Sequence, residues 1–148
     1  MRDLDSWMSG AIAEARAALE HGDVPVGAVV VRLSDGQIVA HAHNARERDG
    51  DPTAHAEVDA FRAAGRRPHY RDTVMVTTLA PCFYCSGLVR QFAIPRVIVG
   101  ESRTFQGGIE WLRSSGVEIA DLGSAECEEL LGGFIAERPD VWDEDIGI

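Results

Sequence analysis

The chain has 148 residues, of which 45% are hydrophobic and 26% charged, and its formal net charge is −10. This length predicts a single domain spanning residues 1–148, and this composition excludes a collagen-like or fully disordered chain. No apolar run approaches the roughly 18 residues that cross a bilayer, and the first residues show no apolar signal segment. We therefore expect a cytoplasmic location.

Negative charge concentrates at the C-terminal end. Residues 117–148 contain ten Asp and Glu residues and a single basic residue, Arg138. An acidic segment argues against a polyanion-binding face in this part of the chain. With no apolar run long enough to cross a bilayer, we expect neither a nucleic acid nor a membrane as partner.

The first third of the chain predicts a helix, two strands joined by a tight turn, and a polar loop, at 6–21, 26–33, 37–43 and 45–54. Trp7, Met8 and Ile12 recur at helical spacing, and Asp5 or Ser6 is the expected cap. The strands are rich in β-branched residues or alternate in polarity, whereas the loop is rich in charge, Gly and Pro.

The remainder predicts alternating helices and strands, at 55–64, 73–78, 81–91, 96–100, 108–115, 117–120 and 124–137. Pro81 is expected at the first position of its helix. This order predicts an α/β fold, in which a mixed five-stranded sheet lies between two layers of helices. Right-handed crossovers then bring the first turns of helices 55–64 and 81–91 to the same edge of the sheet.

A histidine and two cysteines fall at those two helix starts, in the pattern His55-Ala56-Glu57 followed by Pro81-Cys82-Phe83-Tyr84-Cys85. This pattern is the signature of zinc-dependent deaminases. Zinc prefers thiolate and imidazole ligands, and two cysteines three residues apart share one helix face. Three protein ligands leave one coordination position open, which is typical of a catalytic rather than a structural zinc site.

Glu57 lies two residues beyond the histidine, close enough to serve that open position without binding the metal. We expect hydroxide formed on zinc to attack the substrate while Glu57 transfers protons. The two alternatives are a structural zinc site with Cys127 as fourth ligand and a redox pair of cysteines. A structural site has no use for Glu57, and a redox pair needs no histidine.

With these motifs the chain resembles the cytidine deaminase-like superfamily, and most closely fungal-type cytosine deaminase, which acts on the free base. The resemblance runs nearly end to end. It is carried by four further segments, at residues 22–27, 43–44, 95–101 and 137–147.

The resemblance also implies roles for residues outside the zinc motif. It assigns Asn44 to the polar edge of the pyrimidine, Phe105 to the face of its ring, and Asp145 to its exocyclic amine. Trp142 belongs to a C-terminal segment that closes the pocket, and Ile146, four residues later, lies on the same side of a helical turn. Ala56 stands beside the substrate, where the fungal enzymes have glycine. The resemblance further implies a homodimer.

The predicted reaction is hydrolysis of cytosine or isocytosine to uracil and ammonia. Four residues near the pocket depart from the fungal pattern: Ala56, Ala80, Phe83 and Tyr84. The sequence therefore does not decide between cytosine and isocytosine as the substrate. Guanine, nucleoside and tRNA adenosine deaminases of the same superfamily are the alternatives. From another class, the chain is a non-catalytic binding module that zinc stabilises.

Overall fold

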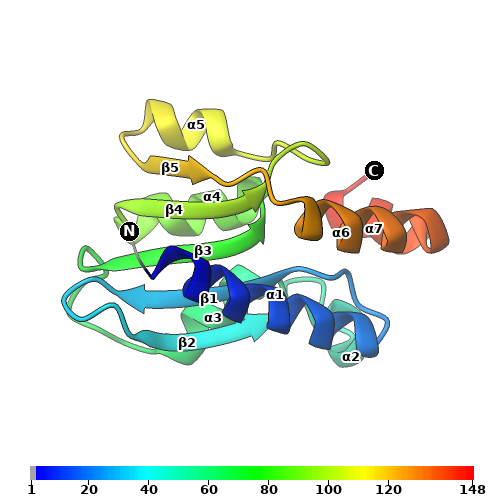
Figure 1. The fold of residues 1–148 in the computed structure, drawn as a ribbon, viewed down its shortest axis with the longest axis horizontal. Coiled ribbons are helices and arrows are strands. Elements are labelled where there is room, and N and C mark those ends of the chain that lie inside the picture. The colour runs from blue at the N-terminus through cyan, green and yellow to red at the C-terminus, as the bar shows by residue number, and fades with distance from the viewer. Residues whose placement is uncertain (1–2) are drawn as a thin grey trace.

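The computed structural model describes residues 3–148 and is built on one five-stranded sheet (Figure 1). In the sheet, β1 is antiparallel to β2 and β3, while β3, β4 and β5 run parallel. The strand order is β2-β1-β3-β4-β5, with bounds Gly27–Arg32 (β1), Ile38–His43 (β2), Thr73–Leu79 (β3), Arg96–Glu101 (β4) and Glu118–Asp121 (β5).

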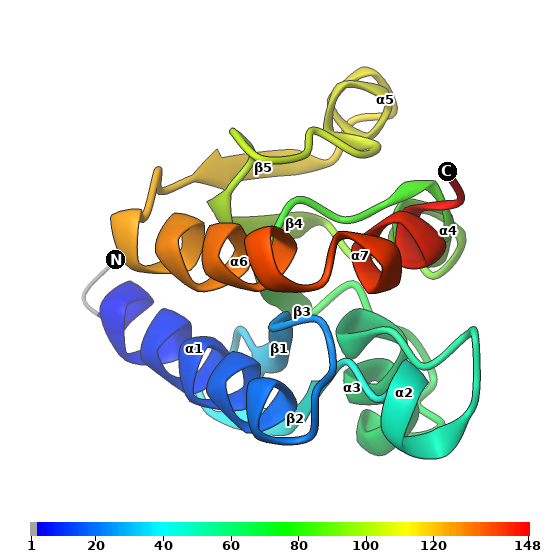
Figure 2. The same cartoon turned by 90° about the vertical axis from the view of Figure 1, so that its right-hand side faces the viewer.

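Helices cover both faces of this sheet, as the edge-on view in Figure 2 shows. One face carries α1 and α6, and the other carries α3 and α4, so the predicted three-layer α/β/α fold is confirmed. The helices are Leu4–Glu20 (α1), Arg46–Asp49 (α2), Ala56–Ala64 (α3), Phe83–Gln91 (α4), Ile109–Ser114 (α5), Ala125–Glu137 (α6) and Pro139–Ile146 (α7).

The apolar core divides along the sheet. Trp7, Met8 and Ala11 of α1 pack on alternate residues of β1 and β3, including Val29 and Val76. The larger cluster joins β1, β3 and β4 to α3, α4 and α5 on the other face, and it extends at its end to Leu131 and Phe134 of α6 and to Trp142 of α7. Every residue of β3 is buried, as expected of a central strand covered on both faces.

Glycine allows α1 to approach the sheet closely. A Cβ atom built on Gly27 would lie 1.9 Å from the backbone oxygen of Ala11. A side chain here would therefore force the helix away from β1.

Two sequence-based expectations about helix starts are wrong. The N-cap of α1 is Asp3, whose side chain makes no capping hydrogen bond, so Asp5 and Ser6 lie inside the helix. The N-cap of α4 is Cys82, and Pro81 lies outside the helix. The sulfur of Cys82 accepts a hydrogen bond from the backbone N–H of Cys85 and so caps α4. The prediction from Pro81 overlooked this cap, because it placed the proline at the first helical position.

The segment 45–54, expected to be a loop, contains the short helix α2. The buried carboxylate of Asp23 accepts from the backbone N–H of Glu47 at 2.6 Å and of Arg48 at 3.4 Å. A carboxylate at a helix N-terminus satisfies free N–H groups and favours the first turn. The cap comes from 24 residues away, so local sequence did not show it.

No helix within residues 3–148 combines the length and the apolar character needed to cross a membrane.

Candidate metal and substrate site

The zinc motif lies at one edge of the sheet, where β3 ends and two helices begin. The chain leaves β3 at Leu79 and reaches the first cysteine of the motif three residues later. His55 is the N-cap of α3 and Cys82 the N-cap of α4, so both side chains point from helix starts. The sequence-based placement of these two helix starts side by side is confirmed, because the donor atoms of His55, Cys82 and Cys85 all lie within 4.8 Å of one another.

The spacing of the three donor atoms fits a zinc ion. The Nδ1 atom of His55 lies 3.5 Å from the sulfur of Cys82 and 3.5 Å from that of Cys85. Bond lengths of about 2.0–2.1 Å to nitrogen and about 2.3 Å to sulfur, at a tetrahedral angle, place such donors about 3.6 Å apart. The histidine nitrogen is thus already at the distance from each sulfur that zinc requires.

The electrostatics of His55, Cys82 and Cys85 also favour a cation. The hydrogen bond with Cys85, assisted by His55, lowers the pKa of Cys82 to about 4 despite burial. The same contact with Cys82, together with burial, raises the pKa of Cys85. Burial opposes the charged imidazole, yet hydrogen bonds with Asp145 and Cys82 raise the pKa of His55 to about 10. A metal ion would replace the protons held by His55 and Cys85.

Asp145 ties the last helix to the centre of this site. Its Oδ1 atom lies 3.0 Å from Nε2 of His55, and its Oδ2 atom accepts a 2.8 Å hydrogen bond from the side-chain amide of Asn44. A carboxylate on the outer nitrogen of a histidine fixes the ring and leaves the other nitrogen for a metal. Here that other nitrogen is Nδ1, which faces the two sulfurs.

Asn44 is itself fixed from several directions. Its backbone N–H donates to the carbonyl of Val26, its side-chain oxygen accepts from the N–H of Arg46, and only 2% of the residue is exposed. The side-chain amide therefore points into the site from a rigid position between β2 and α2.

Glu57 lies in the first turn of α3 and is 4% exposed. Burial raises the pKa of its carboxyl group to about 7, although nearby His55 opposes the shift. A carboxyl group with a pKa near neutrality is suited to taking up and giving back a proton.

Phe105 reaches the site from the loop after β4. The side chain of Glu101 accepts from the N–H of Thr104, and the N–H of Gly108 donates to the carbonyl of Pro81. Gly107 has a φ of +53°, and a Cβ atom there would meet the Pro81 oxygen at 2.2 Å. These constraints hold the loop against the start of α4.

The rings of Phe105 and Trp142 meet edge to face, with centroids 5.7 Å apart and planes at 89°. Trp142 is buried on α7, the helix that also carries Asp145 and Ile146. Two contacts therefore hold α7 against the pocket: the ring contact of Trp142 with Phe105 and the ion pair of Asp145 with His55.

One pocket brings all these residues together. It is lined by every residue that the sequence assigned to substrate binding or proton transfer. His55 and Cys82 of the candidate zinc site also line it, whereas Cys85 is fully buried and does not. The lining consists of Val24, Val26, Asn44, His55, Ala56, Glu57, Leu79, Ala80, Cys82, Phe105, Trp142, Asp145 and Ile146. Its free volume is about 20 Å³, which is room for roughly one water molecule.

Tyr84, which the sequence analysis placed near the pocket, lies beside His55. The two ring centroids are 5.4 Å apart, and the Tyr84 hydroxyl donates to the carbonyl of Thr53. Sequence reasoning missed two other neighbours of the site. Val24 and Val26 were assigned to a turn and a strand, with no sign that they form a wall of the pocket.

Comparison with known proteins agrees with this geometry. Residues 1–101 match the model of the cytidine and deoxycytidylate deaminase zinc-binding region. The chain is 35% identical to cytosine deaminase of Candida albicans over 139 residues, covering 93% of this chain and 92% of that protein. It is 37% identical to tRNA-specific adenosine deaminase of Streptococcus pyogenes over 109 residues, covering 72% of this chain and 63% of that protein.

A solved structure from work on tRNA A34 deaminases, which edit adenosine to inosine, superposes with a TM-score of 0.75. It is 27% identical, and the match covers 86% of this chain and 99% of that one. The site and the fold are those of a zinc-dependent hydrolytic deaminase. The chain belongs to the cytidine and deoxycytidylate deaminase zinc-binding family.

Cysteine labelling tests the metal cluster. In metal-free protein at pH 6, iodoacetamide should modify Cys82 first, because its lowered pKa leaves it ionised and it is the least buried of the three cysteines. Cys85 and Cys127 are buried and should react slowly. One equivalent of zinc should protect Cys82, as peptide mass spectrometry would show. Equal labelling of Cys127, or labelling of Cys82 that zinc does not slow, would contradict this assignment.

Proposed function

We propose that this protein hydrolyses the exocyclic amine of a free pyrimidine base, cytosine or isocytosine, to give uracil and ammonia. The observation that carries the proposal is the closure of the pocket by α7, through the contacts of Asp145 with Asn44 and His55. Because the free volume beneath α7 is only about 20 Å³, we expect α7 to move outward to admit a base and then to cover it. A ribose or a tRNA strand would have to pass through the closing helix.

The proposed chemistry divides between a metal and the side chains around it. His55, Cys82 and Cys85 would hold zinc. When bound, zinc supplies the Lewis acidity that lowers the pKa of a coordinated water to about 7.

Glu57 takes one proton from the attacking water and delivers it to a ring nitrogen. It then takes the second proton, from the hydroxyl group now bonded to the ring carbon, and delivers it to the departing amine. A new carbon–oxygen bond forms, the carbon–nitrogen bond breaks, and ammonia leaves. The nearly complete burial of Glu57 supports this role, because a buried carboxyl group with a pKa of about 7 exchanges protons readily at neutral pH.

Asn44 and Asp145 orient the base in this proposal. The amide of Asn44 hydrogen-bonds the polar edge of the ring, and the carboxylate of Asp145 accepts from the exocyclic amine. Both groups already point at one another across the pocket, so a base entering between them exchanges their mutual hydrogen bond for two new ones. Phe105 and Trp142 supply the aromatic wall.

Charge favours a small substrate over tRNA. The pocket is closed by α7, which contributes four of the ten acidic residues in the stretch 117–148. A tRNA enzyme needs positive charge around its active site to neutralise phosphates. The match to tRNA-specific adenosine deaminase nevertheless makes tRNA the second candidate to be tested.

We also propose a homodimer formed through α4 and α5. Three large aromatic side chains are exposed there: Phe83 is 72%, Tyr84 47% and Trp111 45% accessible. Burying these rings against a second copy would remove apolar surface from water beside the zinc site.

A substrate panel tests the proposed function directly. We expect kcat/KM for cytosine or isocytosine to exceed that for cytidine, guanine, adenine and an adenosine-containing tRNA anticodon stem-loop by at least about a hundredfold. This is because an enclosed pocket excludes the larger substrates sterically. Ammonia release at equal zinc loading is the measurement. Faster turnover of the stem-loop or of a nucleoside than of every free base would overturn the proposal.

Replacing the proton-transfer group tests the mechanism. Glu57→Gln should keep zinc and thermal stability but lower kcat by at least about 10²-fold, since an amide cannot carry a proton between water and base. Asp59→Asn is the matched control, because Asp59 is on the same helix but pairs with Arg62. The control should retain wild-type turnover. Near-normal kcat in Glu57→Gln would place the proton path elsewhere.

A further inference from the structure

A second cavity lies at the opposite end of β3 from the zinc site. The zinc motif follows the last residue of β3, whereas this cavity is lined by the loop that leads into its first residue. A strand of seven residues separates the two by about 20 Å. The cavity has a volume of about 680 Å³, within the range of about 300–1,000 Å³ common for small-molecule pockets.

Arginines gather around this cavity in a chain whose net charge is −10. Residues 62–71 contain four arginines and no acidic residue, and all four arginines line the cavity. We call this cavity, with Arg62, Arg66, Arg67 and Arg71, the arginine groove.

Only part of the positive charge in the arginine groove is neutralised. Arg62 pairs with Asp59 at 2.7 Å and Arg67 with Asp72 at 3.0 Å. Within residues 3–148, Arg66 and Arg71 make no hydrogen bond or ion pair. The Nε atom of Arg67 is buried and lacks a partner, which is costly unless a ligand satisfies it.

The ends of α3 and α4 weaken this positive field without removing it. Both helices end at the groove, and the carbonyl ends of two helices together offset about one unit of positive charge. The positive charge of the four guanidinium groups exceeds the negative charge of the two carboxylates and the two helix ends together. The groove therefore keeps a net positive charge and favours an anion.

Aromatic rings form the other wall of the arginine groove. Phe61 packs against Tyr70 with centroids 4.4 Å apart and against Phe92 with centroids 4.7 Å apart. Tyr70 is held by its hydroxyl, which donates to the carbonyl of Gly65, and the guanidinium of Arg67 lies 5.4 Å from its ring centroid. Phe92 remains 46% exposed, so it offers a surface for a further flat ring.

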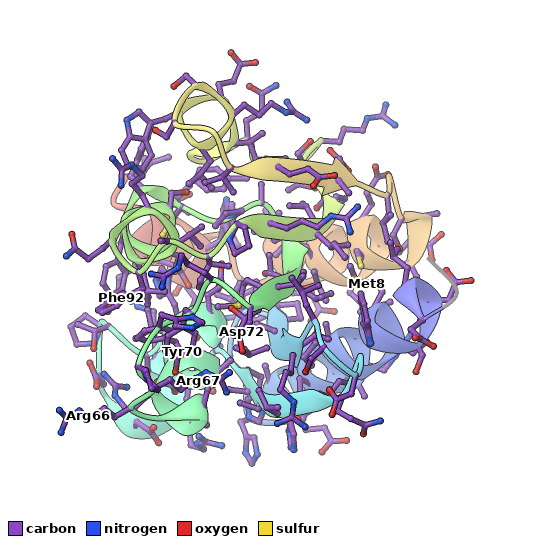
Figure 3. The ribbon with its side chains drawn as sticks, turned by 90° about the vertical axis from the view of Figure 1, so that its left-hand side faces the viewer. Met8, Arg66, Arg67, Tyr70, Asp72 and Phe92 are labelled. Atoms are coloured by element: carbon purple, nitrogen blue, oxygen red, sulfur yellow. The ribbon has the colours of Figure 1, made fainter. Side chains whose placement is uncertain are left out.

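Figure 3 views the molecule from this end and shows Arg66, Arg67, Tyr70 and Phe92 gathered on the same side, with Arg66 pointing outward. Guanidinium groups bind phosphate through paired hydrogen bonds, and aromatic side chains stack on heterocyclic bases. A molecule carrying both a phosphate and a planar ring matches the two walls of the arginine groove together.

We propose that the arginine groove binds a nucleoside monophosphate, at a site separate from the zinc pocket. The phosphate lies against Arg66, Arg67 and Arg71, and the base lies against Phe92. This site goes beyond the proposed deamination, since it uses none of the residues that line the zinc pocket.

Calorimetric titration of the zinc-loaded protein tests the proposal. Uridine monophosphate and adenosine monophosphate should both bind, because stacking on Phe92 tolerates either base. Uridine and inorganic phosphate should each bind at least about tenfold more weakly, since each fills one wall only. No binding of either nucleotide would overturn the proposal. So would inorganic phosphate binding as tightly as the nucleotides, which would reveal a plain anion site.

Variants locate the binding. Arg66→Ala/Arg71→Ala should weaken nucleotide binding at least about tenfold while leaving turnover of the free base unchanged. Arg16→Ala/Arg32→Ala is the matched control: it removes the same charge from two exposed arginines that pair with Glu126 and Asp35. The control should bind nucleotide normally. Equal binding by both double variants would place the nucleotide elsewhere and refute the site.

Sedimentation velocity identifies the other possible occupant, a second copy of the chain. The wild type and Arg66→Ala/Arg71→Ala should have the same oligomeric state. Loss of a dimer in this variant, with no nucleotide binding by the wild type, would show that the groove is an interface and would refute the proposal.

Discussion

A single carboxylate, that of Asp145, connects the end of the chain to the centre of the site. It contacts the outer nitrogen of His55 and the amide of Asn44, which lie 90 and 101 positions earlier in the sequence. By holding Nε2 of His55 it leaves Nδ1 facing the two cysteine sulfurs, at the spacing that zinc needs. The position of α7, the orientation of the His55 ring and the placement of the Asn44 amide therefore depend on one another.

This connection has a consequence for substrate entry. With α7 in place, the pocket has a free volume of about 20 Å³, too small for a pyrimidine ring. The proposed function therefore requires that Asp145 exchange its contact with Asn44 for the base and that α7 move outward as the base enters. Because Trp142 packs on Phe105 from the same helix, that movement also opens the aromatic wall. In the proposed function, α7 is a closing element that selects for substrates small enough to be covered.

The parts of the site that sequence alone predicted are those set by local spacing. His55, Glu57, Cys82 and Cys85 follow from helix geometry and zinc chemistry, and the hydrophobic periodicity was sufficient for the three-layer fold. Asn44 and Asp145 were assigned only by resemblance, because nothing local links residues 101 positions apart. The helix α2 was missed for the same reason, since its capping carboxylate comes from Asp23. The arginines of residues 62–71 are visible in the sequence, but the cavity that gathers them with Phe92 is a product of tertiary packing.

Hydrogen exchange of α7 tests the closure most directly. In the Glu57→Gln protein loaded with zinc, saturating free base should slow amide exchange in the peptide covering Pro139–Ile146, while the peptide covering α1 stays unchanged. Adding Asp145→Asn should remove most of that protection, because the carboxylate that joins α7 to the base and to His55 is gone. If α7 exchanges equally fast with and without the bound base, the helix does not close over the substrate and the account is wrong.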